Sequence, residues 1–154
     1  MELFLTAILI LAAAALVTAL LAALASFCPP SAANCRTANC LGSCCAALGC
    51  LTGLCAVAAG PWDATLILEL PWGLPAGALV LGLDPLSRIF LLPVFGLGMV
   101  CAVSGGLSLR HTSPREHNLG AHWFFYLLLL LGMVVVMSAR DAVLFLLAWE
   151  IMSL

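Results

Sequence analysis

Long apolar segments separated by short polar ones make up most of this sequence. Uncharged stretches cover Leu3–Phe27, Leu41–Ala59, Ile89–Leu109 and Leu119–Ala139. Each is close to the ~20 residues that an α-helix needs to cross the hydrocarbon layer of a membrane. The pattern therefore predicts an all-α integral membrane protein with four full transmembrane helices, at about 3–27, 41–59, 86–109 and 119–139.

The two ends of the sequence add to this prediction. The first stretch has no basic residue before it and exceeds the roughly 7–15 apolar residues of a cleaved signal, so we expect a retained helix. A fifth apolar stretch, 142–154, is too short to cross, and a helix ending there would leave its last carbonyl groups unpaired in hydrocarbon. We expect a truncated fifth helix and a single membrane domain, 1–154, that is the N-terminal portion of a longer protein.

The connection between the second and third helices has a different pattern. Prolines at 61, 71 and 75 disfavour a helix, while Thr65–Leu70 and Ala78–Leu83 are apolar runs on either side of a Pro-Trp-Gly-Leu-Pro turn. This predicts a short β-hairpin, at about 61–84, on the outer side of the membrane. Asp84 then precedes a proline, which favours a helix start, and Arg88 follows one turn later, where we expect an ion pair with Asp84.

Composition and charge agree with a membrane location. Of the 154 residues 65% are hydrophobic and 8% charged, more apolar surface than a soluble domain of this size exposes, and the net charge of −2 gives no reason to expect a nucleic-acid partner. Cytoplasmic loops collect basic residues. Arg36, Arg110 and Arg115 occupy the first and third connections, whereas the hairpin connection has none. We expect a multi-pass protein in the lipid bilayer of the cytoplasmic (inner) membrane, with its N-terminus outside.

Glu150 is the most unusual residue of this pattern. From Ala142 to Leu154 all side chains except that of Glu150 are apolar or small. If the helix starts near Asp141, a rise of about 1.5 Å per residue places this carboxyl group roughly 14 Å deep, near the middle of the membrane. An ionisable residue at this depth is costly and usually belongs to an ion or proton path, so we predict that Glu150 is a proton-relay residue. The alternative is a structural role, as a protonated carboxyl group hydrogen-bonded across helices.

The sequence offers no evident cationic partner for Glu150. All five basic residues are arginines at helix ends or in connections, and there is no lysine. His122 lies one turn inside the fourth helix, about 10 Å from the level of Glu150, so direct contact is not expected. We keep His122, Asp84 and Arg88 as accessory candidates and expect His111 and His117 to be solvated loop residues.

The cysteines do not have the spacing of a metal site. Seven of the eight fall between Cys28 and Cys55, but none forms a Cys-x-x-Cys pair. From Cys40 onward they alternate with Ala, Gly, Ser and Leu, as in closely packed membrane helices. We expect packing residues, with disulfides or redox sensing as alternatives, and we expect no metal, cofactor or catalytic residue in this chain.

Two segments resemble a known family of membrane subunits. The first is Leu70-Pro-Trp-Gly-Leu-Pro-Ala-Gly-Ala-Leu-Val-Leu-Gly-Leu-Asp-Pro-Leu-Ser87, and the second is Phe145-Leu-Leu-Ala-Trp-Glu-Ile-Met-Ser-Leu154. In this order they resemble hydrogenase-4 component B and formate hydrogenlyase subunit 3, which are antiporter-like subunits related to those of respiratory complex I and Mrp-type antiporters. The similarity extends from about Leu66 to Leu154, and the residues before it match only as apolar helices.

The resemblance implies a role for Glu150. In the family, a glutamate at this position of the fifth helix pairs with a lysine on a later helix and helps to move protons through a hydrated channel. The implied function is that of a non-catalytic, proton-translocating subunit of a hydrogenase-4, formate hydrogenlyase or complex I-like redox complex, with other membrane subunits as partners. The alternatives are a subunit of an Mrp-type sodium/proton antiporter and a non-transporting membrane scaffold.

Overall fold

The computed structural model describes residues 4–6, 32–59, 62, 65–70, 79–111 and 118–153. The predicted first helix, 3–27, lies outside the described residues except for 4–6, which are helical. Asp63, Arg115 and His117 also lie outside them. The elements are, in chain order, α2 (Ala32–Ala59), β1 (Leu66–Leu70), β2 (Leu79–Leu83), α3 (Pro85–Ser108), the 3-10 helix η1 (Leu109–His111), α4 (Leu119–Ser138) and α5 (Ala142–Ser153).

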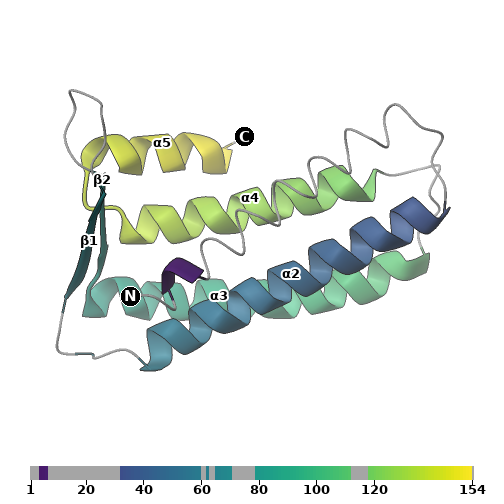
Figure 1. Cartoon of the computed structure of the whole chain (residues 1–154), viewed down its shortest axis with the longest axis horizontal. Coiled ribbons are helices and arrows are strands. Elements are labelled where there is room, and N and C mark those ends of the chain that lie inside the picture. The colour runs from purple at the N-terminus through teal and green to yellow at the C-terminus, as the bar shows by residue number, and fades with distance from the viewer. Residues whose placement is uncertain are drawn as a thin grey trace.

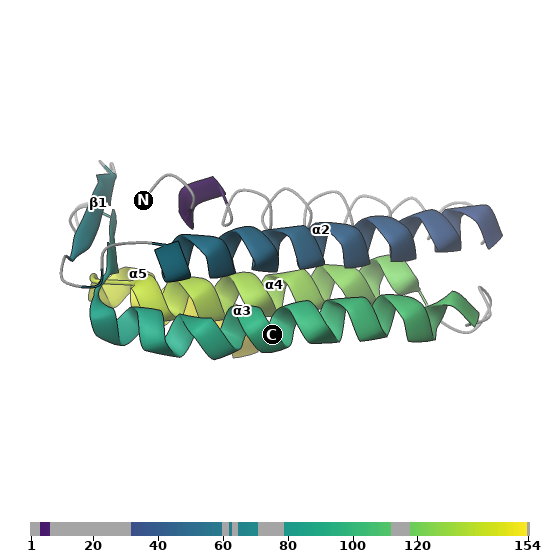
Figure 2. The same ribbon diagram turned by 90° about the horizontal axis from the view of Figure 1, so that it is seen from below.

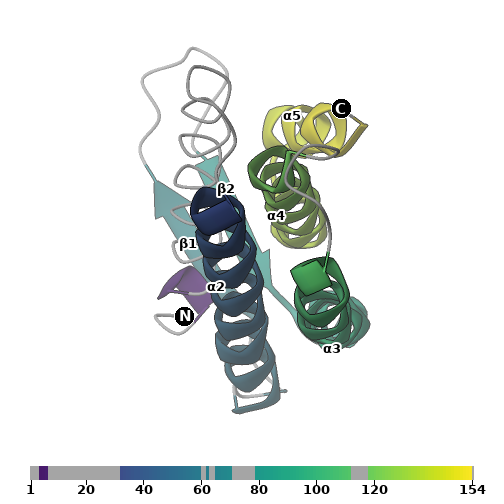
Figure 3. The same cartoon turned by 90° about the vertical axis from the view of Figure 1, so that its right-hand side faces the viewer.

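Three of the described helices are long and apolar enough to cross a membrane. These segments are Arg36–Ala59, Pro85–Ser108 and Leu119–Ser138. They lie side by side along the long axis of the molecule, and α5 folds back beside α4 (Figures 1 and 2). The end-on view in Figure 3 shows α2, α3 and α4 around a common centre, with α5 on the far side of α4. The fold is that of a mostly helical membrane protein with a small hairpin at one end.

Helix α2 begins nine residues earlier than the apolar pattern predicts. The sequence places residues 26–39 in a loop, but the helix starts at Ala32 and includes Arg36 and Asn39. The polar residues end the uncharged stretch, yet the segment after Pro30 contains neither proline nor glycine to stop a helix. Helix α2 is therefore longer than the uncharged stretch that predicted it.

Capping side chains fix the starts of the other three helices. The Asp84 Oδ1 atom accepts a hydrogen bond from the Ser87 backbone N–H at 2.8 Å, and Pro85 follows the cap as expected. Asn118 Oδ1 accepts from the Ala121 N–H at 3.2 Å. Asp141 Oδ2 accepts from two N–H groups of the first turn of α5, at 3.0 and 3.2 Å. These caps satisfy donors that the first turn of a helix leaves free.

The predicted hairpin is present between α2 and α3. Its strands pair antiparallel, with Leu66 opposite Leu83 and Leu70 opposite Leu79. The outer edge of β2 continues into the turn between α4 and α5, because the Arg140 N–H donates to the Val80 carbonyl at 2.9 Å. The hairpin thus joins the α2–α3 and α4–α5 connections at one end of the bundle (Figure 1).

Small residues let the helices approach one another closely. A Cβ atom at Gly42 would overlap the side chain of Trp123, and one at Gly53 would overlap the ring of Phe95. Both aromatic rings are fully buried. The buried face of α2 therefore consists of small residues that receive large side chains from α3 and α4, as is common in membrane bundles.

Candidate functional site

Glu150 lies on α5, eight residues and about 12 Å along the helix axis from Ala142. Its side chain is exposed on the surface of the described chain. Within the described residues its carboxylate has no hydrogen-bond or ion-pair partner, although its backbone carbonyl accepts from the Ser153 hydroxyl at 2.8 Å. The carboxylate therefore points outward from the bundle.

The face of α5 opposite α4 is apolar around Glu150. The helix packs on α4 through the buried residues Leu144 and Ala148, and Met152 approaches Gly132. Its remaining side chains form an exposed apolar surface that includes Val143, Phe145, Leu146, Leu147 and Trp149. We call these five residues and Glu150 the α5 outer face.

His122 is far from Glu150, as the sequence predicts. It lies one turn into α4, at the end of the bundle opposite the hairpin, whereas α5 starts at the hairpin end. Along the helix axes the two residues differ in height by roughly 13 Å. His122 is exposed, and its ring meets the edge of Trp123 with 5.5 Å between centroids. The structure does not bring it to the candidate site.

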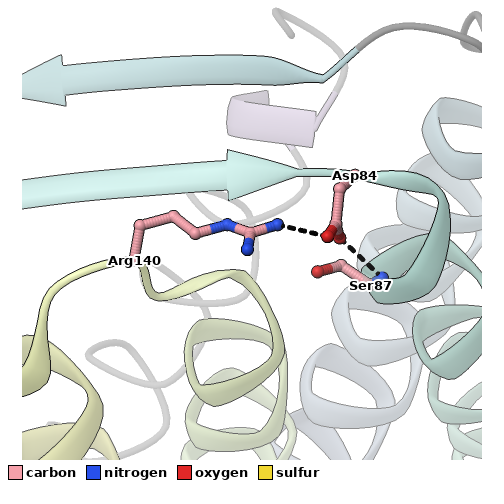
Figure 4. A network of polar contacts seen from close by, with 3 residues as sticks. All are labelled: Asp84, Ser87 and Arg140. Atoms are coloured by element: carbon pink, nitrogen blue, oxygen red, sulfur yellow. Dashed lines mark hydrogen bonds and ion pairs between the residues drawn. The ribbon is translucent and has the colours of Figure 1, made fainter.

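Asp84 forms an ion pair at the hairpin end of the bundle (Figure 4). Its Oδ2 atom lies 2.7 Å from Nη2 of Arg140, in the turn between α4 and α5. Arg140 crosses over Gly82, where an added Cβ would lie 2.6 Å from its Nε atom. The hydrogen bond from Arg140, followed by those from Ser87, holds the pKa of Asp84 well below its ordinary value. This cluster joins β2, the start of α3 and the residue before the α5 cap.

The prediction that Asp84 pairs with Arg88 is wrong, because Asp84 pairs with Arg140 instead. Arg88 is fully buried, and its Nη1 donates to the Val57 carbonyl near the end of α2 at 3.3 Å. Its Nε and Nη2 atoms have no hydrogen-bond partner among the described residues. The reason is that the Asp84 carboxylate caps α3 and faces Arg140, while the face of α3 that bears Arg88 packs against α2. A guanidinium beside the last carbonyls of a helix also complements the helix dipole.

Three hydrogen bonds inside the bundle are not predicted by the apolar pattern. The buried side chain of Asn39 donates to the Gly106 carbonyl at 2.9 Å and accepts from the Trp123 indole N–H at 3.0 Å. Tyr126 donates its hydroxyl hydrogen to the Gly98 carbonyl at 2.6 Å. The apolar pattern predicts that Asn39 lies in a loop, so it does not mark this residue as part of the core. These contacts fix α2, α3 and α4 relative to one another.

The described residues contain no group of three or more histidine, cysteine, aspartate or glutamate side chains placed to hold a metal ion. The site is thus a single carboxylate on an apolar helix face, with an ion pair at the start of the same helix.

No protein-family model matches the sequence, and no curated protein matches it.

Proposed function

We propose that this chain belongs to a proton-translocating, antiporter-like membrane subunit of a hydrogenase-4, formate hydrogenlyase or complex I-like complex, with Glu150 as the relay carboxylate. The observation that supports this function is the position of Glu150, the ninth of the twelve residues of the apolar helix α5, with a carboxylate that has no partner among the described residues. Charged residues at such depth face the interior of a bundle or a water-filled cavity rather than lipid. The α5 outer face is therefore expected to be covered by further protein that supplies a cation.

The ion pair at the hairpin end suits a supporting role. Asp141 caps α5, and the neighbouring Arg140 is held by Asp84. A rigid start of α5 fixes the height and direction of the helix that presents Glu150, which proton transfer over short distances requires. In the proposed function Asp84 and Arg140 are positioning residues. Arg88 contributes a fixed positive charge between α2 and α3, and His122 has no assigned role.

The test is proton uptake by inverted membrane vesicles from cells that express the intact protein with its complex. Glu150→Gln removes the titratable proton and keeps the size and polarity of the side chain. We expect uptake to fall about a hundredfold or more, the lower end of the range for the loss of one proton-transfer group. The matched control is Glu69→Gln, on the exposed part of β1, which should leave uptake unchanged. Uptake at the normal rate in an assembled Glu150→Gln complex would exclude the relay role.

A further inference from the structure

The exposed face of α2 carries two thiols one helical turn apart. Cys40 and Cys44 are four residues apart, the spacing that places two side chains on one face of a helix. Both are free and exposed. The hydroxyl of Ser43, next to Cys44, donates to the backbone carbonyl of Cys40 at 3.3 Å. The opposite face of α2, with the buried Ala46 and Cys50, makes the contacts with the rest of the bundle. The packing role expected for the cysteines therefore fits Cys50 but leaves this pair unexplained.

A disulfide between these two thiols does not fit an intact helix. Cβ atoms four residues apart on a helix are separated by about 5–6 Å, whereas a disulfide needs about 3.5–4.5 Å. A bridging metal ion fits better, because metal–sulfur bonds of about 2.3 Å in a linear arrangement separate the two sulfur atoms by about 4.6 Å. The spacing thus suits a two-coordinate ion, and the described residues offer no third ligand for a tetrahedral one.

Arg36 makes the charge balance of such a site favourable. It lies four residues before Cys40 on the same face and is also exposed. When two thiols bind a monovalent ion they release two protons, the oxidation state of the metal does not change, and the complex carries one negative charge. The guanidinium of Arg36 is always cationic and can offset that charge near the end of the helix. Thiolate ligands select soft ions, of which copper(I) is the common monovalent one in cells.

We propose that Cys40 and Cys44 bind one copper(I) ion on the exposed face of α2, beside Arg36. The site is separate from Glu150, since the two lie on different helices. It is also independent of proton transport, so either proposal can fail without the other.

The test is an anaerobic titration of the purified full chain with copper(I) in competition with a chromophoric chelator. We expect one tight equivalent in the wild-type chain and its loss in Cys40→Ser/Cys44→Ser. Each single variant should lose about a hundredfold or more in affinity, because one thiol alone cannot chelate. The matched control, Cys55→Ser/Cys101→Ser, removes two exposed thiols that have no cysteine one turn away, and should keep the tight equivalent.

A second measurement needs no variant. Copper(I) should protect Cys40 and Cys44, but not Cys55 or Cys101, from alkylation, as read by mass spectrometry of the wild-type chain. Silver(I), which does not change oxidation state, should protect the same pair. Retention of the tight equivalent by the double variant Cys40→Ser/Cys44→Ser, or equal protection of all four thiols, would overturn the proposal.

Discussion

At the scale of single residues, Asp84 has two functions that can be separated. One carboxylate oxygen caps α3 through the Ser87 N–H, and the other pairs with Arg140. The side chains of Asp84 and Arg140 are 24% and 38% exposed, so solvent screens the pair and its contribution to stability is modest. An asparagine at position 84 keeps the cap and loses the ion pair, whereas an alanine loses both.

The lowered pKa of Asp84 predicts the pH dependence of this contribution. Because the folded protein holds a lower pKa than the ordinary 3.8, the stabilisation is fully present above pH 3.8 and is lost as the pH falls below that value. At neutral pH we expect Asp84→Asn to lower the free energy of unfolding by about 0.2–1 kcal/mol, and Asp84→Ala by about 1 kcal/mol more. Thermal unfolding in detergent at neutral and acid pH measures both effects. A difference between wild type and Asp84→Asn that grows on acidification would contradict the assigned ion pair.

The two arginines at the hairpin end show how far the sequence defines single contacts. The motif identifies Asp84 as a cap, and the structure confirms it. Helical spacing alone pairs Asp84 with Arg88, but the true partner, Arg140, is far away in sequence and comes close only because the hairpin and the α4–α5 turn share one end. Glu150 is similar, since its position along α5 is predicted by the sequence while its outward direction depends on how α5 packs on α4.

At the scale of helices, packing depends on small residues at particular positions. The Gly42 backbone lies against Trp123, whose indole N–H bonds to Asn39 one turn earlier on α2. A larger side chain at position 42 must move α2 away from α4 and strain this hydrogen bond. The sequence predicted tight packing of a small-residue helix, but it could not identify which glycines meet an aromatic ring.

Gly42→Ala is therefore expected to destabilise the bundle by about 1–3 kcal/mol, the usual range for overpacking. The gain in helix propensity, about 1 kcal/mol at most, does not offset the upper part of this range. Gly96→Ala on α3 is the matched control, because a Cβ there has no atom within 4 Å. Thermal unfolding of the two variants in detergent should give a lower midpoint only for Gly42→Ala. Equal midpoints would show that α2 and α4 are not in close contact at this position.

At the scale of the whole molecule, the described residues place opposite charges at the two ends of the bundle. The hairpin end has Glu69, Asp84 and Asp141, while its Arg88 is buried and its Arg140 is paired. The other end has Arg36 in the first turns of α2 and Arg110 after α3, both exposed. The basic residues in the connections predict the sign of this asymmetry, and the antiparallel order of α2, α3 and α4 brings the charges together at each end.

Exposed arginines favour the cytoplasmic side, so we expect the hairpin to face outside. Reporters inserted after Trp62 and after Arg110 test this: alkaline phosphatase should be active only at the first position, and a fluorescent protein should fluoresce only at the second. Arg36→Glu/Arg110→Glu should reduce or invert this orientation, because it replaces two of the three arginines that set the bias with acidic residues. Arg140→Gln is the control, since that arginine lies at the hairpin end and its loss leaves the bias intact. Phosphatase activity at position 110 in the unmodified chain would place the hairpin inside and reverse the direction of proton access in the proposed function.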